Sequence, residues 1–255
     1  MPEVGRGGTA KGSAVFSILL FGTENTAMLV YAPMTLLELS AICADNQLIV
    51  DEFAQTKLHD YSILLASWNS RINLISRKDE ENIFSRHILH SLTLRMPAIC
   101  NYDFSYKRVA DVGTGGGLPG IPLKIVTPSL DMTLIDSVQK KITACNDMIM
   151  SLGLGGSRAI AGRAEELARL PEQSHQYDVI ISRAVASLED LTKWTYGLLK
   201  PAGTLFSLKG GDLTEEIKRT QRLKFVSSVR ETSLLLAKYD DLAKEDKKLV
   251  RVDLV

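Results

Sequence analysis

The spacing of hydrophobic residues divides the chain into two parts. Between residues 34 and 97, apolar side chains recur every three or four positions with charged residues between them, which predicts amphipathic helices. The first two helices carry Leu36, Leu37, Leu39, Ile42 and Cys43, and then Leu58, Tyr61, Leu64, Leu65 and Trp68. A third helix is predicted over residues 80–95 and is stopped by Pro97.

From residue 107 onward, short apolar runs alternate with amphipathic stretches, which predicts a doubly wound α/β fold with a parallel sheet. The predicted strands are 108–112, 132–135, 157–161, 177–182 and 204–209, and the helices between them are 118–126, 139–152, 163–170 and 188–199. Two more strands are predicted at 225–236 and 249–255. Their charged linker, 238–248, is too polar for a packed crossover helix, so we expect these strands to pair antiparallel and complete a seven-stranded, mainly parallel sheet.

These patterns define three segments. Residues 34–97 are expected to form an N-terminal helical segment that packs on the core, and residues 98–255 the ligand-binding domain. Residues 1–33 lack an orderly pattern and are expected to be a poorly ordered extension or the product of an upstream start codon. Their apolar run at 14–22 is short and is followed by polar residues, which disfavours a signal peptide.

Composition narrows the functional classes. The 30 basic and 30 acidic residues cancel, so any binding of nucleic acid must come from a local patch. The three cysteines stand far apart, which disfavours disulfides, zinc and iron–sulfur clusters and suits the cytoplasm. No apolar stretch reaches the roughly 18 residues of a membrane span. We therefore expect a cytoplasmic protein without metal or membrane partner.

A glycine-rich segment, residues 111–120 (DVGTGGGLPG), follows the first predicted strand and opens a helix. Glycines allow a tight turn and a close approach of ligand to backbone. Gly115, Gly117 and Gly120 fit the dinucleotide pattern G-x-G-x-x-G, and Asp136 ends the next strand, where a carboxylate can bind a ribose. The pattern alone is compatible with a nicotinamide dinucleotide, with S-adenosylmethionine, or with a connection that binds no ligand.

Three features favour a methyltransferase over a dehydrogenase. Asp111 suits a ligand with a cationic amino group better than a pyrophosphate. The turn contains Pro119 and no basic residue that could offset phosphate charge. An antiparallel pair at the end of a parallel sheet is the layout of class I methyltransferases.

Several motifs occur in the order of one known family. They are NLIS at 73–76, RHILHSL at 86–92, DVGTGGGLPGIP at 111–122, LIDS at 134–137, ISRA at 181–184 with AS at 186–187, and LKG at 208–210. With these motifs the chain resembles the ribosomal RNA small-subunit methyltransferase G family over residues 34–255. The resemblance implies a class I fold that transfers methyl from S-adenosylmethionine to guanine N7 in 16S ribosomal RNA.

The resemblance also implies roles for individual residues. Gly113, Gly115 and Leu118 match cofactor contacts of the turn, together with Asp111. Asp136 matches the ribose-binding acid. Ala164 and Glu165 match a pair beside the adenine, and Arg183 stands where the methionine end and the target base should meet.

Two positions depart from the family pattern. His90 stands where the family usually has Asp, which puts fine positioning of the substrate in question. Gly116 stands where the family commonly has a residue other than glycine. We expect this difference to have little effect, because glycine fits any turn geometry.

Guanine N7 has a lone pair and no proton, so no general base is needed and Arg183 is the candidate catalytic residue. Its planar guanidinium suits guanine O6, a phosphate or the cofactor carboxylate. Arg86, His87 and Lys209 are the candidate contacts to RNA, with 16S RNA or the small ribosomal subunit as partner. The alternatives are a methyltransferase of the same fold acting on another RNA or a small molecule, and a noncatalytic RNA-binding module.

Overall fold

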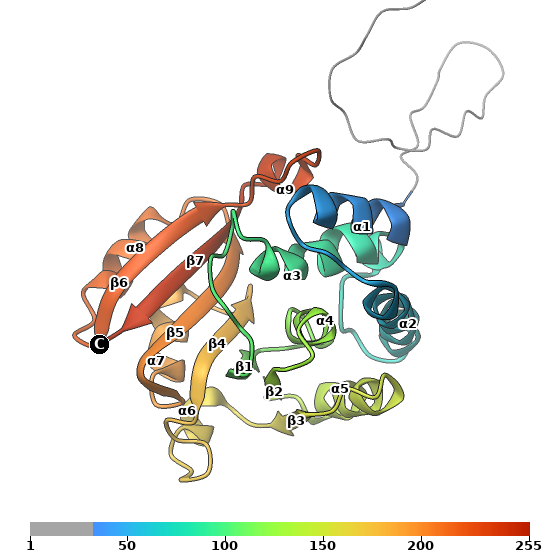
Figure 1. Ribbon diagram of the computed structural model, residues 1–255. Helices are drawn as coiled ribbons and strands as arrows, with labels where there is room; N and C mark the ends of the chain where they lie inside the picture. The colour runs from blue at the N-terminus through green and yellow to red at the C-terminus, as the bar shows by residue number, and fades with distance from the viewer. Residues whose placement is uncertain (1–32) are drawn as a thin grey trace, which may run out of the picture.

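A seven-stranded sheet forms the centre of the computed structural model, which describes residues 33–255 (Figure 1). The strand order is β3-β2-β1-β4-β5-β7-β6. The strands are β1 (Arg108–Val112), β2 (Asp131–Asp136), β3 (Ser157–Ala161), β4 (Tyr177–Arg183), β5 (Leu199–Gly210), β6 (Val226–Ser233) and β7 (Lys247–Leu254). The first five strands are parallel and β7 is antiparallel to both β5 and β6, which confirms the predicted mixed sheet.

The order of the strands reverses between β1 and β4. β2 follows β1 on one side, whereas β4 lies on the other side, so the two crossovers leave in opposite directions. In open parallel sheets such a reversal opens a crevice at the carboxyl ends of the strands, where ligands bind. The glycine turn after β1 and the residues that end β2 and β4 therefore meet at one edge of the sheet.

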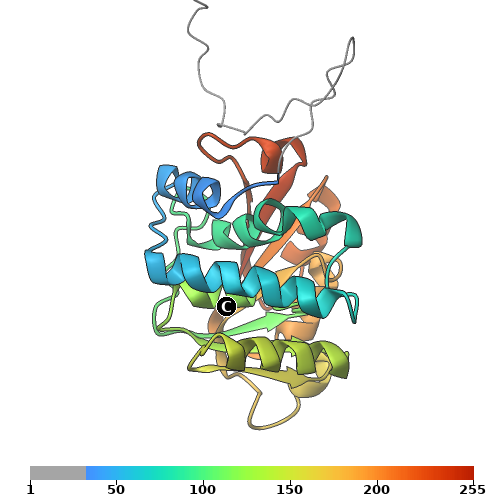
Figure 2. The ribbon, with the colours of Figure 1, turned by 90° about the vertical axis from the view of Figure 1, so that its right-hand side faces the viewer.

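Helices cover both faces of the sheet (Figures 1 and 2). One face packs on α4 (Gly120–Val126) and α5 (Gln139–Ser151), and outside them on the N-terminal helices α1 (Leu36–Asp45) and α2 (Glu52–Asn69). The other face packs on α6 (Ala164–Leu167), α7 (Leu188–Thr195) and α8 (Thr214–Gln221). The N-terminal helices are thus a third layer of the same core, and the expectation for residues 1–32 lies outside the described residues.

The segment predicted as one helix over 80–95 consists of four short pieces. They are a 3₁₀ helix η1 (Arg77–Asn82), a π-helical turn η2 (Ile83–Leu89), a short α3 (His90–Leu92) and a 3₁₀ turn η3 (Thr93–Arg95). The prediction of a single α-helix was wrong, because the segment passes through 3₁₀, π and α geometry. A π-helical turn forms i to i+5 backbone hydrogen bonds instead of the i to i+4 bonds of an α-helix, and the spacing of apolar residues does not distinguish the two.

Other element boundaries also differ from the prediction. The helix predicted at 163–170 is only α6, and the one predicted at 188–199 ends at Thr195. Helix α8 was missed because it buries little apolar surface, and the charged linker carries one more short helix, α9 (Asp241–Lys244). Within residues 33–255, no helix is long and apolar enough to cross a membrane.

The helix α2 is bonded to the glycine turn by a buried contact. The Tyr61 hydroxyl, which is fully buried, donates to the Gly116 carbonyl at 2.8 Å. Replacing Tyr61 by Phe leaves that carbonyl without its partner, so we expect a loss of about 1 kcal/mol in the free energy of unfolding. Urea titration of Tyr61→Phe measures this loss. Tyr106→Phe, at an exposed position, is the matched control; equal stability of both variants would show that the contact contributes nothing.

Candidate functional site

The turn after β1 is fixed from below by Asp111. One of its carboxylate oxygens, Oδ2, accepts hydrogen bonds from the Thr114 hydroxyl at 2.7 Å and from the Gly120 amide at 2.9 Å. The side chain is completely buried, and its other oxygen, Oδ1, has no hydrogen-bond partner among the described residues. Burial raises the pKa of Asp111 to about 7, against the lowering effect of these two hydrogen bonds.

Glycine is required at the start of the turn. Gly113 has a φ of 73°, and a Cβ there would lie 2.3 Å from a methyl group of Val185. Its backbone amide donates to the Ile135 carbonyl at 2.8 Å, which ties the turn to β2. The backbone of Gly113 can therefore form the floor of a ligand site without a side chain in the way.

Asp136 closes the turn from the end of β2. Its carboxylate accepts from the amides of Gly115 at 3.1 Å and Val138 at 2.9 Å, and Lys141 lies 3.7 Å away. These contacts hold the carboxylate at the carboxyl edge of the sheet, beside the glycine turn.

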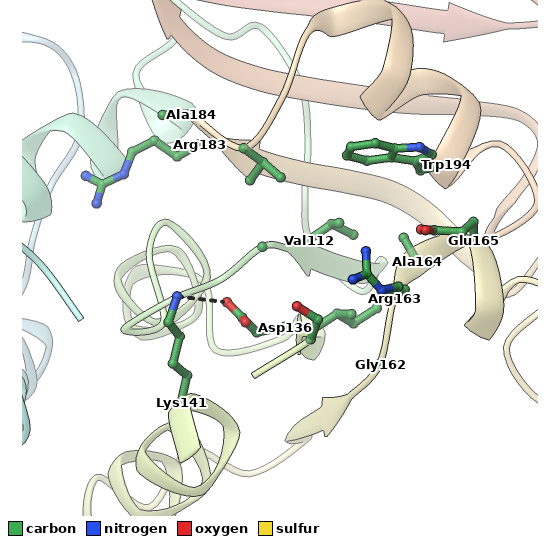
Figure 3. Close-up of a pocket in the computed structure, with 14 residues that line it drawn as sticks. Val112, Asp136, Lys141, Gly162, Arg163, Ala164, Glu165, Arg183, Ala184 and Trp194 are labelled. Carbon is green, nitrogen blue, oxygen red and sulfur yellow. Dashed lines mark ion pairs between the residues drawn. The ribbon is translucent and has the colours of Figure 1, made fainter. Parts of the chain in front are cut away.

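A cavity of about 330 Å³ opens between this carboxylate and the ends of β1 and β4 (Figure 3). Five predicted site residues line it: Gly113, Asp136, Ala164, Glu165 and Arg183. The other three predicted cofactor contacts, Asp111, Gly115 and Leu118, are not among its lining residues. Asp111 and Leu118 are buried behind the turn, where they shape it.

Residues not singled out from the sequence complete the cavity: Ser137, Lys141, Arg163, Val185 and Trp194. Trp194 is 36% exposed, and Figure 3 shows its ring near Ala164 and Glu165. The hydrophobic pattern of α7 could have shown that Trp194 lies outside the buried face of the helix. Its buried residues Leu188 and Leu191 define one face, and Trp194 lies off that face.

A second cavity, of about 290 Å³, adjoins the first, and Arg183 and Ala184 line both. The Arg183 guanidinium points away from Asp136 (Figure 3). Its Nη1 lies 3.1 Å from His87 Nδ1 and 3.5 Å from the Arg86 carbonyl. Burial, with Arg183 and Arg86 nearby, lowers the pKa of His87 to about 3. The neutral ring therefore accepts from Arg183 through Nδ1 and carries its proton on Nε2.

The three candidate RNA contacts, Arg86, His87 and Lys209, all line this second cavity. Arg86 is half exposed, with Asp79 at 3.5 Å and Glu245 at 3.4 Å. The Lys209 ammonium was expected either to contact phosphate or to be solvated. The structure instead holds it between Glu216, at 2.8 Å, and the Ala186 carbonyl, at 2.7 Å.

Both departures from the family pattern lie at this site. His90 is buried and lines the second cavity. A Cβ at Gly116 would lie 2.7 Å from a methyl of Leu65 and 3.2 Å from Leu74 Cβ. Leu65 of helix α2 therefore occupies the space that a side chain at position 116 would need. Glycine at this position allows α2 to pack closely against the turn.

The sheet order, the glycine turn and the acidic end of β2 together define a class I methyltransferase fold. A solved structure from Agrobacterium tumefaciens, described as a predicted O-methyltransferase, shares this fold, with a TM-score of 0.50 over 65% of this chain and 80% of its own at 13% identity. The sequence model of the rRNA small subunit methyltransferase G family matches residues 54–244.

Relatives with the same description extend this match. Those of Chlorobium phaeobacteroides and Chlorobium luteolum are 41% and 40% identical, over 71% and 80% of this chain and 78% and 83% of their own. The chain belongs to the rRNA small subunit methyltransferase G family. Among the described residues, no group of three His, Cys, Asp or Glu side chains could hold a metal ion.

Asp111 gives the fold a specific pH dependence. Its pKa of about 7 exceeds the ordinary value of 3.8, so the folded state binds this proton more tightly than the unfolded state. Its contribution to stability is full below pH 4 and decreases as the pH rises towards 7. Asp111→Asn keeps one acceptor oxygen and adds no charge. Between pH 5 and pH 8 we expect the free energy of unfolding of this variant to decrease less than that of the native protein, by on the order of 2 kcal/mol. Thermal unfolding of both proteins at pH 5 and pH 8 measures the effect, and parallel pH profiles would refute it.

Proposed function

We propose that the protein transfers a methyl group from S-adenosylmethionine to N7 of a guanine in 16S ribosomal RNA, in the cytoplasm. Membership of the rRNA small subunit methyltransferase G family carries this proposal. The geometry that supports it is the pair of adjoining cavities at the switch in strand order, because methyl transfer needs two ligand sites that meet.

The first cavity fits S-adenosylmethionine. Asp136 offers carboxylate oxygens for ribose hydroxyls, and Ala164, Glu165 and Trp194 offer a partly apolar wall for the adenine. Its volume of about 330 Å³ is in the lower part of the range of small-molecule sites. Asp111 lies buried beneath the turn, and its ionised form adds negative potential that suits the cationic methionine end.

When bound, S-adenosylmethionine supplies a methyl group on a sulfonium cation. A guanine N7 aligned with this methyl would accept it through its own lone pair as the carbon–sulfur bond broke, so that the base would become cationic and a neutral thioether would remain. No proton moves, so the protein needs no general base.

The protein's task is alignment, which can supply about 7–11 kcal/mol of a barrier reduction. Arg183 is placed for it, because its side chain borders both cavities and has five N–H donors. His87 and the Arg86 carbonyl hold one end of the guanidinium, and the other donors can bind O6 of the base. Arg86 is suited to an RNA phosphate, since it is half exposed and only loosely paired.

The proposal predicts N7-methylguanine at one site when unmethylated small subunits are incubated with the protein and S-adenosylmethionine. Mass mapping of the RNA identifies the site.

Asp136→Ala should weaken S-adenosylmethionine binding at least about tenfold, because it removes charged acceptors from the ribose site. Calorimetry measures this loss. Asp131→Ala, at the opposite end of the same strand, is the control and should bind normally. Methylation of another nucleotide, or of none, would overturn the proposed reaction.

Arg86 and Arg183 are expected to fail in different ways. Arg86→Ala should weaken RNA binding and make the slope of log affinity against log salt shallower by about 0.7–0.9, the contribution of one phosphate. Arg183→Ala should lower the single-turnover rate even at saturating RNA. Arg219→Ala, on the exposed side of α8, is the control for loss of a surface charge. An Arg86 variant with unchanged salt dependence would remove that residue from the RNA surface.

A further inference from the structure

The second cavity is formed by parts of the chain that are far apart in sequence. Its walls come from η1 and η2, from the ends of β4 and β5, and from the linker that carries α9. The linker contributes Tyr239, Leu242 and Glu245. Among the described residues it shares Arg183 and Ala184, at the end of β4, with the first cavity, so ligands in the two cavities would meet there.

Two buried histidines mark this cavity as a site for a polar ligand. His87 and His90 both line it and are only 8% and 6% exposed. The Nε2 atom of each has no hydrogen-bond partner among the described residues. An unpartnered polar atom at such depth is unfavourable unless something binds it. Both rings line the cavity, so a polar ligand there would lie beside them, and His87 Nε2 also faces the Asp79 carboxylate at 3.9 Å.

Charged groups of both signs line the cavity, and its carboxylates are Asp79, Asp241 and Glu245. Arg183 and His87 supply donors from the sheet end and from η2. Glu245 supplies an acceptor from the linker, and its two ion pairs, to Arg86 and Lys247, are both 3.4 Å long. Pairs of this length are longer than hydrogen bonds, and the Glu245 side chain is 37% exposed. The carboxylate can therefore exchange these partners for a ligand.

The remaining lining suits a flat, partly apolar group. Leu208, Tyr239 and Leu242 are buried and give the cavity apolar walls. A volume of about 290 Å³ admits one nucleobase with its sugar but not a duplex. A base can enter only if it leaves its stack, as it does in enzymes that modify bases.

We propose that the second cavity receives a single guanine turned out of the RNA, and that Glu245 recognises its Watson–Crick edge. This proposal rests on the proposed function, which places the methyl donor in the first cavity. With N7 directed to the junction, the neighbouring O6 faces the Arg183 donors. The N1–H and 2-amino group, on the other edge, then face the linker wall and donate to the Glu245 carboxylate.

The same arrangement excludes adenine. Adenine has a lone pair on N1 and no 2-amino group, so a carboxylate at this edge repels it and gains no hydrogen bond. Adenine also has an amino group in place of O6, which would confront the Arg183 donors. The linker, which the sequence marks only as charged, thereby acquires a role in specificity.

The test compares guanosine with inosine at the position that mass mapping identifies. Inosine keeps N7, O6 and N1–H and lacks only the 2-amino group. The native chain should methylate guanosine RNA about tenfold faster than inosine RNA under single-turnover conditions, because one charge-assisted hydrogen bond is lost. Glu245→Gln should narrow this preference at least about threefold while leaving S-adenosylmethionine affinity unchanged. Asp240→Asn, a neighbouring exposed carboxylate outside the cavity, should keep the full preference.

A Glu245→Gln protein that folds, binds S-adenosylmethionine and keeps the full preference overturns the proposal. If the native chain methylates no ribosomal RNA, the proposed function fails. NMR titration with guanylate and adenylate then tests independently whether the second cavity prefers guanine. Guanylate binding that Glu245→Gln abolishes, with weaker binding of adenylate, supports the guanine pocket. Equal binding of both nucleotides, or no effect of the substitution, overturns it.

Discussion

The buried carboxylate of Asp111 is the contact on which the site depends. It bonds Thr114 and Gly120, at the two ends of the glycine turn, and so sets the path of the backbone between β1 and α4. Everything at the edge of the sheet is placed relative to that turn: the amide of Gly115 bonds Asp136, and the carbonyl of Gly116 bonds Tyr61. Because the carboxylate is buried, a ligand can sense it only through its field and through the shape it imposes.

Arg183 connects the two halves of the site. It ends β4, borders both cavities and is held by His87 and the Arg86 carbonyl, which belong to the N-terminal helical layer. The N-terminal layer is thus more than a cover for the sheet, since it orients the side chain that borders both cavities. The cavity beside Asp136 is built on β1, β2 and α5, whereas the second cavity is built on η2, β5 and the linker. One substitution can therefore disturb one cavity and spare the other.

Much of the fold could be predicted from the sequence because periodicity reports burial. The strands from β1 to β4 were placed within a residue or so, and the antiparallel end was predicted from the polarity of residues 238–248. The predictions were wrong where tertiary packing overrides the local pattern. Residues 83–89 form a π-helical turn within a stretch of helical spacing, and α8 forms with little apolar surface. The motifs pointed to Asp136 and Arg183, which line the cavities. They did not point to Trp194 or Glu245, which also line them, because no short motif shows which distant segments share a cavity.

The position of β7 has a consequence for the time at which the site is completed. β7 is the last strand along the chain but lies between β5 and β6, and within residues 33–255 it is the one strand with which β6 pairs. During synthesis, residues 111–194 emerge well before the linker and β7. A growing chain can therefore assemble the cavity beside Asp136 while the one beside Glu245 still lacks a wall. The second cavity therefore has all of its lining residues only when synthesis is nearly complete, whereas those of the first are present about 50 residues earlier.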